Sequence, residues 1–170
     1  TTKVMVRHYI KNLHVGASYK HPLRLSDKLE RLSFSELSTY CERLEFPETL
    51  SYLKLPLSYR MWAHLPCNLR TFKIGIMPNS YWQQMHNEIK RLTIDHDLKF
   101  DPEILPSKLE YLALLGGSNC PPKNKLPKTL RTLVIKDPEH KVANSLAKKL
   151  GREWVRVDHY KLDRLTYIKL

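Results

Sequence analysis

Apolar and polar residues follow one pattern that returns about every twenty residues along most of this chain. Each unit has apolar side chains at its first, fifth, eighth and tenth positions, as in LPCNLRTFKI from Leu65. Seven units begin 19 to 21 residues apart, at Val6, Leu25, Phe46, Leu65, Met85, Leu105 and Leu126. All 28 apolar positions hold Leu, Ile, Val, Phe or Met, whereas a 42% hydrophobic content alone would fill roughly 12 of them (0.42 × 28). The pattern therefore indicates a repeat protein.

The end of each unit predicts a short strand. The last two apolar positions are separated by one residue, which is the spacing of a strand with one buried face. Repeats of this length and core are typical of leucine-rich-repeat solenoids. We expect about seven short strands, one per turn, in a parallel sheet on the concave face. Four units have proline at their second position, which predicts a corner before the strand because proline fixes φ and has no amide donor: Pro47, Pro66, Pro106 and Pro127.

The segments that return from one strand to the next are expected on the convex side, irregular or briefly helical. Apolar residues have helical spacing over residues 36–44 and, after a potential N-cap at Ser80, over residues 82–89. We therefore expect one or two helical turns in each of these segments. Together with the strands, they predict an α/β repeat fold of the leucine-rich type.

The pattern changes after the seventh unit. Asp137 is suited to cap a helix, and the apolar spacing that follows predicts a helix over about 138–150. The terminal sequence WVRVDHYKLDRLTYIKL alternates like a pair of strands. We expect residues 1–136 to form the solenoid and residues 137–170 to form a cap that shields its end, the alternative being a junction to a further domain or partner.

The units LPCNLRTFKI, LPSKLEYLAL and LPKTLRTLVI resemble the LP-x-x-L-x-x-L-x-L/I core of FNIP repeats, which are relatives of leucine-rich repeats. Tyr19-Lys20-His21-Pro22-Leu23 keeps the spacing of the F-N-x-P-I/L stretch of that family, while most other turns lack it. The resemblance covers about residues 6–135 and implies a binding scaffold, tied in some members to F-box or other ubiquitin-ligase modules. Bacterial effector ligases have similar units, but their turns carry an N-x-L asparagine step after the strand, which this chain lacks.

The charge adds a second global feature. The chain has 29 Lys and Arg against 17 Asp and Glu, a net charge of +12, which favours nucleic acid, acidic proteins or anionic membrane as partners. The basic residues are dispersed, so a structured basic surface is expected rather than a disordered arm. No apolar run approaches the ~20 residues of a membrane helix, and the start has no secretory-signal layout. Because it also lacks an initiator Met, we expect a processed or trimmed chain, or part of a longer one.

Cysteine usage and motifs bear on compartment and chemistry. Cys41, Cys67 and Cys120 are odd in number and far apart, which predicts small buried niches in a reducing, intracellular setting, the cytoplasm or nucleus. No phosphate-binding loop or nucleophile elbow occurs. The pair His64-x-x-Cys67 has no second ligand pair at zinc spacing, and Asp95-His96-Asp97 is typical of a polar turn. We therefore expect no enzyme, no cofactor and no metal.

The outward positions of the strands are the candidate binding site. The residue between the last two apolar positions of each unit, and the two residues before them, give 21 positions with eight Lys or Arg and two Glu. Glu30 and Glu110 both stand beside basic residues. Arg and Tyr are enriched at binding hot spots, although any solvated sheet face also needs polar, strand-tolerant residues. The candidates near the middle are Arg31, Tyr52, Lys54, Lys73, Arg91 and Tyr111.

Two partner classes fit this stripe. The first is an acidic protein surface or peptide, steered by charge and anchored by the tyrosines, in an adaptor or substrate-recognition module. The alternative is a structural RNA-binding subunit of a ribonucleoprotein particle, in which Lys and Arg hold phosphates without reading sequence. No RNP, KH or zinc-finger signature is present, so RNA would be recognised by shape and charge.

Overall fold

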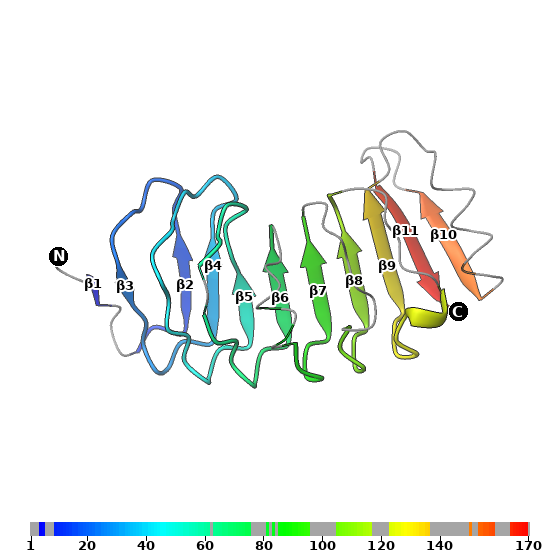
Figure 1. The fold of residues 1–170 in the computed structure, drawn as a ribbon, viewed down its shortest axis with the longest axis horizontal. Helices are drawn as coiled ribbons and strands as arrows, with labels where there is room; N and C mark the ends of the chain where they lie inside the picture. Colours follow the sequence, from blue (N-terminus) through cyan, green and yellow to red (C-terminus); the bar gives the residue numbers. More distant parts are fainter. Residues whose placement is uncertain are drawn as a thin grey trace.

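The computed structural model describes residues 4–5, 9–61, 63–75, 81, 83, 85–95, 105–116, 123–136, 150, 153–158 and 164–169. Over these residues the chain is a β-solenoid whose main sheet has nine strands in the order β10-β11-β9-β8-β7-β6-β5-β4-β2 (Figure 1). Seven neighbouring strands are parallel: β2 (Asn12–Val15), β4 (Arg31–Phe34), β5 (Tyr52–Lys54), β6 (Thr71–Ile74), β7 (Arg91–Ile94), β8 (Tyr111–Leu114) and β9 (Thr132–Lys136). One strand comes from each sequence unit, so the expected parallel sheet is confirmed.

A repeated hydrogen-bond arrangement fixes the register of these strands. The carbonyl oxygen of Arg70 accepts from the amides of both Lys90 and Arg91, at 2.9 and 3.0 Å. The same double acceptance occurs at the equivalent residue of five other turns: Lys11, Glu30, Ser51, Lys90 and Glu110. Successive strands are therefore paired in register, and equivalent residues of successive units lie opposite each other.

The core is the continuous apolar interior that the repeat predicted. From the second unit onward, the residues at the second, third and fourth apolar positions are at most 7% exposed in every unit. Residues at the first apolar position, such as Leu65 and Leu105, are half-buried and pack against this interior. No turn buries its apolar residues alone, so the stability of each turn depends on its neighbours.

The prolines form the predicted corners. The amide of Leu69 donates to the carbonyl oxygen of Pro66 at 3.1 Å, which closes a turn immediately before β6. The prolines of three other units accept in the same way, in the pairs Leu50 to Pro47, Leu109 to Pro106 and Leu130 to Pro127. Proline suits this position because the turn uses its carbonyl and requires no amide from it.

The returning segments are irregular where the structure describes them, apart from Tyr81, which is helical, and one short 3-10 helix, η2 (Lys123–Lys125). The expected helix over 36–44 is wrong. Tyr40 and Leu44 are buried, but Leu37, which a helix would place on the same face, is 82% exposed. In the second expected helix, residues 85–89 form a turn, closed by the Ile89 amide on the His86 carbonyl at 3.3 Å. The irregular return over residues 36–44 thus places Tyr40 inward without forming a helix.

Three successive turns each place one tyrosine in the core behind the sheet. Tyr40, Tyr59 and Tyr81 are buried, and each hydroxyl bonds to the backbone of the preceding turn. The Tyr40 hydroxyl accepts from the Leu23 amide at 3.2 Å, whereas the Tyr59 hydroxyl donates to the Glu42 carbonyl at 3.3 Å. Burial raises the pKa of all three phenols, that of Tyr59 to about 12. The aromatics of these returns therefore pack the core, as expected.

The tail contains the predicted pair of strands. β10 (Trp154–Asp158) and β11 (Arg164–Lys169) pair antiparallel, and β11 pairs antiparallel with β9. The buried Tyr167 of β11 joins the core, so the tail extends the sheet. The predicted helix over about 138–150 lies outside the described residues, apart from Leu150.

At the other end of the chain, β1 (Val4–Met5) and β3 (Leu23–Arg24) form a separate parallel pair. In the part of the chain that the structure describes, no helix has the length and apolar character needed to cross a membrane.

Candidate binding face

The outward side chains of the sheet form two rows, which together make up the front face. The register places equivalent residues in line, so each row crosses the strands along the solenoid. The first row is Asn12, Arg31, Tyr52, Thr71, Arg91, Tyr111 and Thr132. The second row is His14, Ser33, Lys54, Lys73, Thr93, Ala113 and Val134.

The second row of the front face is polar from β2 to β7 and is buried at β8 and β9. Ala113 is 2% exposed and Val134 is 7% exposed. The sequence pattern placed both residues on the exposed stripe, and the structure shows that they are buried. The accessible part of the second row is therefore its polar part, from His14 to Thr93.

Two Arg–Tyr pairs organise the first row. The guanidinium carbon of Arg31 lies 4.0 Å from the centre of the Tyr52 ring. The same arrangement recurs three strands later, where Arg91 lies 4.3 Å from the centre of the Tyr111 ring. A cation over an aromatic ring is held by the charge distribution of the ring. Each ring therefore fixes an arginine fork on the surface, so the arginine loses less freedom when it binds an anion.

Between and around these pairs lies a hollow of about 270 Å³, which we call the central hollow. Its described lining is Arg31, Tyr52, Thr71, Lys73, Arg91, Thr93 and Tyr111. Five of the six residues predicted from the sequence are among them. The lining contains three basic side chains and no Asp or Glu. The sequence pattern places Thr71 and Thr93 on this face, but a single threonine on a strand does not by itself indicate a binding residue.

The sixth predicted residue, Lys54, lies apart from this group. Its ammonium forms an ion pair with Glu36 at 2.9 Å. It lines a neighbouring hollow of about 150 Å³, which also contains Lys73, Glu36 and Asp95. Lys54 is therefore charge-balanced by an acid from the preceding turn.

Ion pairs border the other side of the central hollow, where the strands begin. Lys11 pairs with Glu30 at 2.8 Å, and Lys90 pairs with Glu110 at 2.9 Å. The hydrogen bond from Lys90 lowers the pKa of Glu110, and the charge of Arg91 lowers it further. The bond to Glu30 raises the pKa of Lys11. Both acids thus have basic neighbours, as the sequence indicated.

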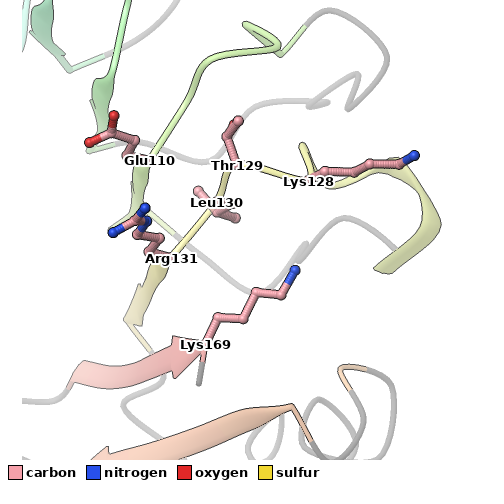
Figure 2. Close-up of a pocket in the computed structure, with 6 residues that line it drawn as sticks. All are labelled: Glu110, Lys128, Thr129, Leu130, Arg131 and Lys169. Carbon is pink, nitrogen blue, oxygen red and sulfur yellow. The ribbon is translucent and has the colours of Figure 1, made fainter.

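A larger hollow of about 420 Å³ lies where β9 and β11 meet (Figure 2). Several of its polar groups are engaged within the fold. The Thr129 hydroxyl lies 2.8 Å from the carbonyl oxygens of both Ser107 and Leu109, and Lys169 pairs with Glu153 at 3.8 Å. Figure 2 shows the lining side chains spread over several segments rather than converging. It is therefore a weaker candidate than the central hollow.

The cysteines do not occupy the expected niches. Cys41 and Cys67 are free and exposed, so the prediction that they are buried is wrong for both. The Cys67 thiol donates a 3.0 Å hydrogen bond to a Glu48 carboxylate oxygen, which raises the pKa of the thiol and lowers that of Glu48. A thiol held protonated in this way is a poor nucleophile. Cys120 lies outside the described residues.

Within the described ranges, no three His, Cys, Asp or Glu side chains are grouped so that they could hold a metal ion. Comparison of the chain with protein-family models, with curated proteins and with solved structures finds no match. The resemblance to FNIP repeats therefore stays a prediction from the LP-x-x-L units.

Proposed function

We propose that this chain is a non-catalytic binding scaffold of leucine-rich type, and that its front face holds an acidic protein partner. The observation that carries the proposal is the central hollow, whose described lining has three basic side chains and no acid. Among these described residues, an anionic partner group meets cations, hydroxyls and aromatic rings. The two other hollows contain carboxylates, so they would bind an anion less favourably.

The chemistry of the lining also fits a protein partner. Arg and Tyr are the residue types that contribute most to protein interfaces, because they combine a large apolar area with directional hydrogen bonds. Tyr52 and Tyr111 are half-buried, so their rings are already fixed before binding. The net charge of +12 would speed the approach of an acidic surface.

An RNA-binding role in a ribonucleoprotein particle is the alternative proposal. Dispersed cations such as Arg70, Lys128 and Arg131 would favour it. The carboxylates of Glu30 and Glu110 count against it, since they border the basic residues and would repel a phosphate chain that continues past the hollow. We therefore favour the acidic protein.

An intracellular setting, in the cytoplasm or nucleus, belongs to the same proposal. Cys41 and Cys67 are exposed free thiols, which suit a reducing compartment. The resemblance to FNIP repeats adds that the scaffold acts as an adaptor or a substrate-recognition module.

Charge reversal on the front face tests the proposal. The test variant carries Arg31→Glu, Lys73→Glu and Arg91→Glu. The matched control carries Arg24→Glu, Lys108→Glu and Lys128→Glu, the same change in net charge at exposed positions outside the central hollow. Affinities for poly-L-glutamate and for single-stranded RNA are measured over a series of salt concentrations, after circular dichroism has shown that both variants are folded.

We expect the test variant to lose poly-L-glutamate binding and the control to retain most of it. Equal losses in both variants would mean that only the overall charge attracts the polymer, and the front face would not be a site. Tighter binding of RNA than of poly-L-glutamate, with a steep log-linear fall in salt, would support the RNA alternative instead.

A further inference from the structure

The lining of the central hollow extends farther across the strands than along them. Its lining comes from five neighbouring strands, β4 to β8, but from only two rows of side chains. Four steps of about 4.8 Å between strands give a length of roughly 19 Å, whereas the two rows are about 7 Å apart along a strand. A ligand that contacts the whole lining is therefore elongated and runs along the solenoid, across the strands whose order Figure 1 shows.

The two Arg–Tyr pairs set a distance along this axis. Arg31 is in β4 and Arg91 is in β7, three steps apart, and Tyr52 and Tyr111 are separated in the same way. Three steps correspond to about 14 Å. An extended peptide rises about 3.4 Å per residue, so residues four apart are also about 14 Å apart. Their side chains point to the same side, because alternate residues of an extended chain share a face.

We propose that the central hollow binds an extended peptide segment along the solenoid axis, with two acidic side chains four residues apart, one on Arg31 and one on Arg91. This inference rests on the proposed function and adds the geometry of the ligand. Each guanidinium presents a planar fork that matches a carboxylate, and each is already seated on a tyrosine ring. Lys73 lies between the two arginines along the axis and adds positive charge to the middle of the hollow.

The surroundings favour such a peptide over a nucleic acid. Carboxylates stand along both long sides of the basic residues: Glu30 and Glu110 where the strands begin, and Glu36 and Asp95 beyond the second row. A phosphodiester chain has a charge on every nucleotide and cannot avoid them. A peptide, in contrast, carries charge only where its sequence has acidic or basic residues. In addition, a guanidinium covers one face of each tyrosine ring, and that face is then closed to a stacked base.

Peptides that differ only in the spacing of their acids test this geometry. The probes are fluorescein-labelled peptides of about ten Gly, Ser and Thr residues with two Asp residues, either four or two positions apart. Fluorescence anisotropy measures their affinity for the full chain, for Arg31→Ala, for Arg91→Ala and for the control Arg24→Ala. Arg24 is exposed in β3, outside the main sheet, so this control removes the same charge elsewhere.

We expect the four-residue spacing to bind about five-fold more tightly than the two-residue spacing, the effect of engaging one additional charge pair. Either Arg31→Ala or Arg91→Ala should abolish this preference, because only one fork is then left. Arg24→Ala should keep it. The preference, rather than the affinity itself, is the readout, so a general loss of charge cannot imitate it.

The other outcomes separate this inference from the proposed function. If both spacings bind equally and both front-face variants weaken them, the spacing inference is overturned and acidic-partner binding stands. If neither peptide binds but single-stranded RNA does, both are overturned in favour of RNA. If none of the three probes binds, both are also overturned.

Discussion

The hydroxyl of Tyr81 donates a hydrogen bond of 2.9 Å to the backbone carbonyl oxygen of Met61, which lies one turn earlier in the solenoid. Such a bond joins neighbouring turns on the side away from the sheet. We expect Tyr81→Phe to lower the free energy of unfolding by about 1 kcal/mol, the typical net value of an intramolecular hydrogen bond. Urea denaturation followed by circular dichroism measures the change.

Tyr19 supplies the matched control, because its buried hydroxyl has no hydrogen-bond partner among the described residues. We expect Tyr19→Phe to be neutral or slightly stabilising, since it removes a buried polar atom without breaking a bond. A loss as large as that of Tyr81→Phe would show that the hydrogen bond is not what makes Tyr81 important.

The raised tyrosine pKa values predict a loss of stability at high pH. Burial raises the pKa of Tyr59 to about 12 in the folded chain, above the ordinary value of about 10 for an exposed phenol. Below about pH 10 the phenol is protonated in both states and stability is unaffected. Between about pH 10 and 12 the unfolded chain loses this proton and the folded chain retains it, so unfolding becomes more favourable.

Unfolding by urea at a series of pH values checks this expectation. Tyr59→Phe removes one such group and should make the decline in stability above pH 10 shallower, even though the variant is less stable at neutral pH. Parallel pH profiles for the two proteins would contradict the assignment.

Gly75 occupies a position with no room for a side chain. A Cβ atom added there would collide with the Cα and the carbonyl oxygen of Leu57 and would lie 2.7 Å from its carbonyl carbon. These are backbone atoms of the preceding turn, so the two turns must move apart. We expect Gly75→Ala to cost roughly 1–3 kcal/mol in unfolding free energy. A Cβ on Gly16 meets nothing within 4 Å, and Gly16→Ala should therefore be close to neutral. Equal effects at both positions would rule out the steric explanation.

The hydrogen bond between Cys67 and Glu48 predicts a difference between two exposed thiols. The carboxylate raises the pKa of Cys67, so a smaller fraction of this thiol is ionised near pH 8 and it should react more slowly with iodoacetamide than an unhindered thiol. Glu48→Gln removes the negative charge and should accelerate Cys67 at least about two-fold while leaving Cys41 unchanged. Mass spectrometry of the alkylated peptides distinguishes the two sites. A Cys67 rate that is the same in both proteins would contradict this account.

The strands and the core could be predicted from the sequence because a single constraint sets both. Each turn repeats the same apolar positions, and stacking them in register is the only way for residues such as Leu69 and Phe72 to be buried. The conformation of the returning segments could not be predicted, for a physical reason. The spacing of Leu37, Tyr40 and Leu44 is compatible with a helix. A return that only has to place Tyr40 and Leu44 inward can nevertheless do so along an irregular path, with Leu37 outside.

The candidate site was partly predictable for the same reason. Parallel strands in register place Arg31, Tyr52 and Arg91 in one row whatever their side chains do. The sequence could not show that the arginines lie on the tyrosine rings, or that Lys54 pairs with Glu36 instead of joining the hollow. Both depend on side-chain conformations and on acids in neighbouring turns.

The alternation of inward and outward side chains along each strand determines which substitutions the fold can accept. Inward positions such as Leu92 contribute to folding, while the outward positions on either side, Arg91 and Thr93, contribute only chemistry to the surface. Because each of the turns that carry β4 to β7 supplies its own accessible outward residues, a replacement there changes the surface chemistry of one strand and leaves the apolar interior unchanged. Natural selection or a protein engineer can therefore retarget the scaffold one turn at a time.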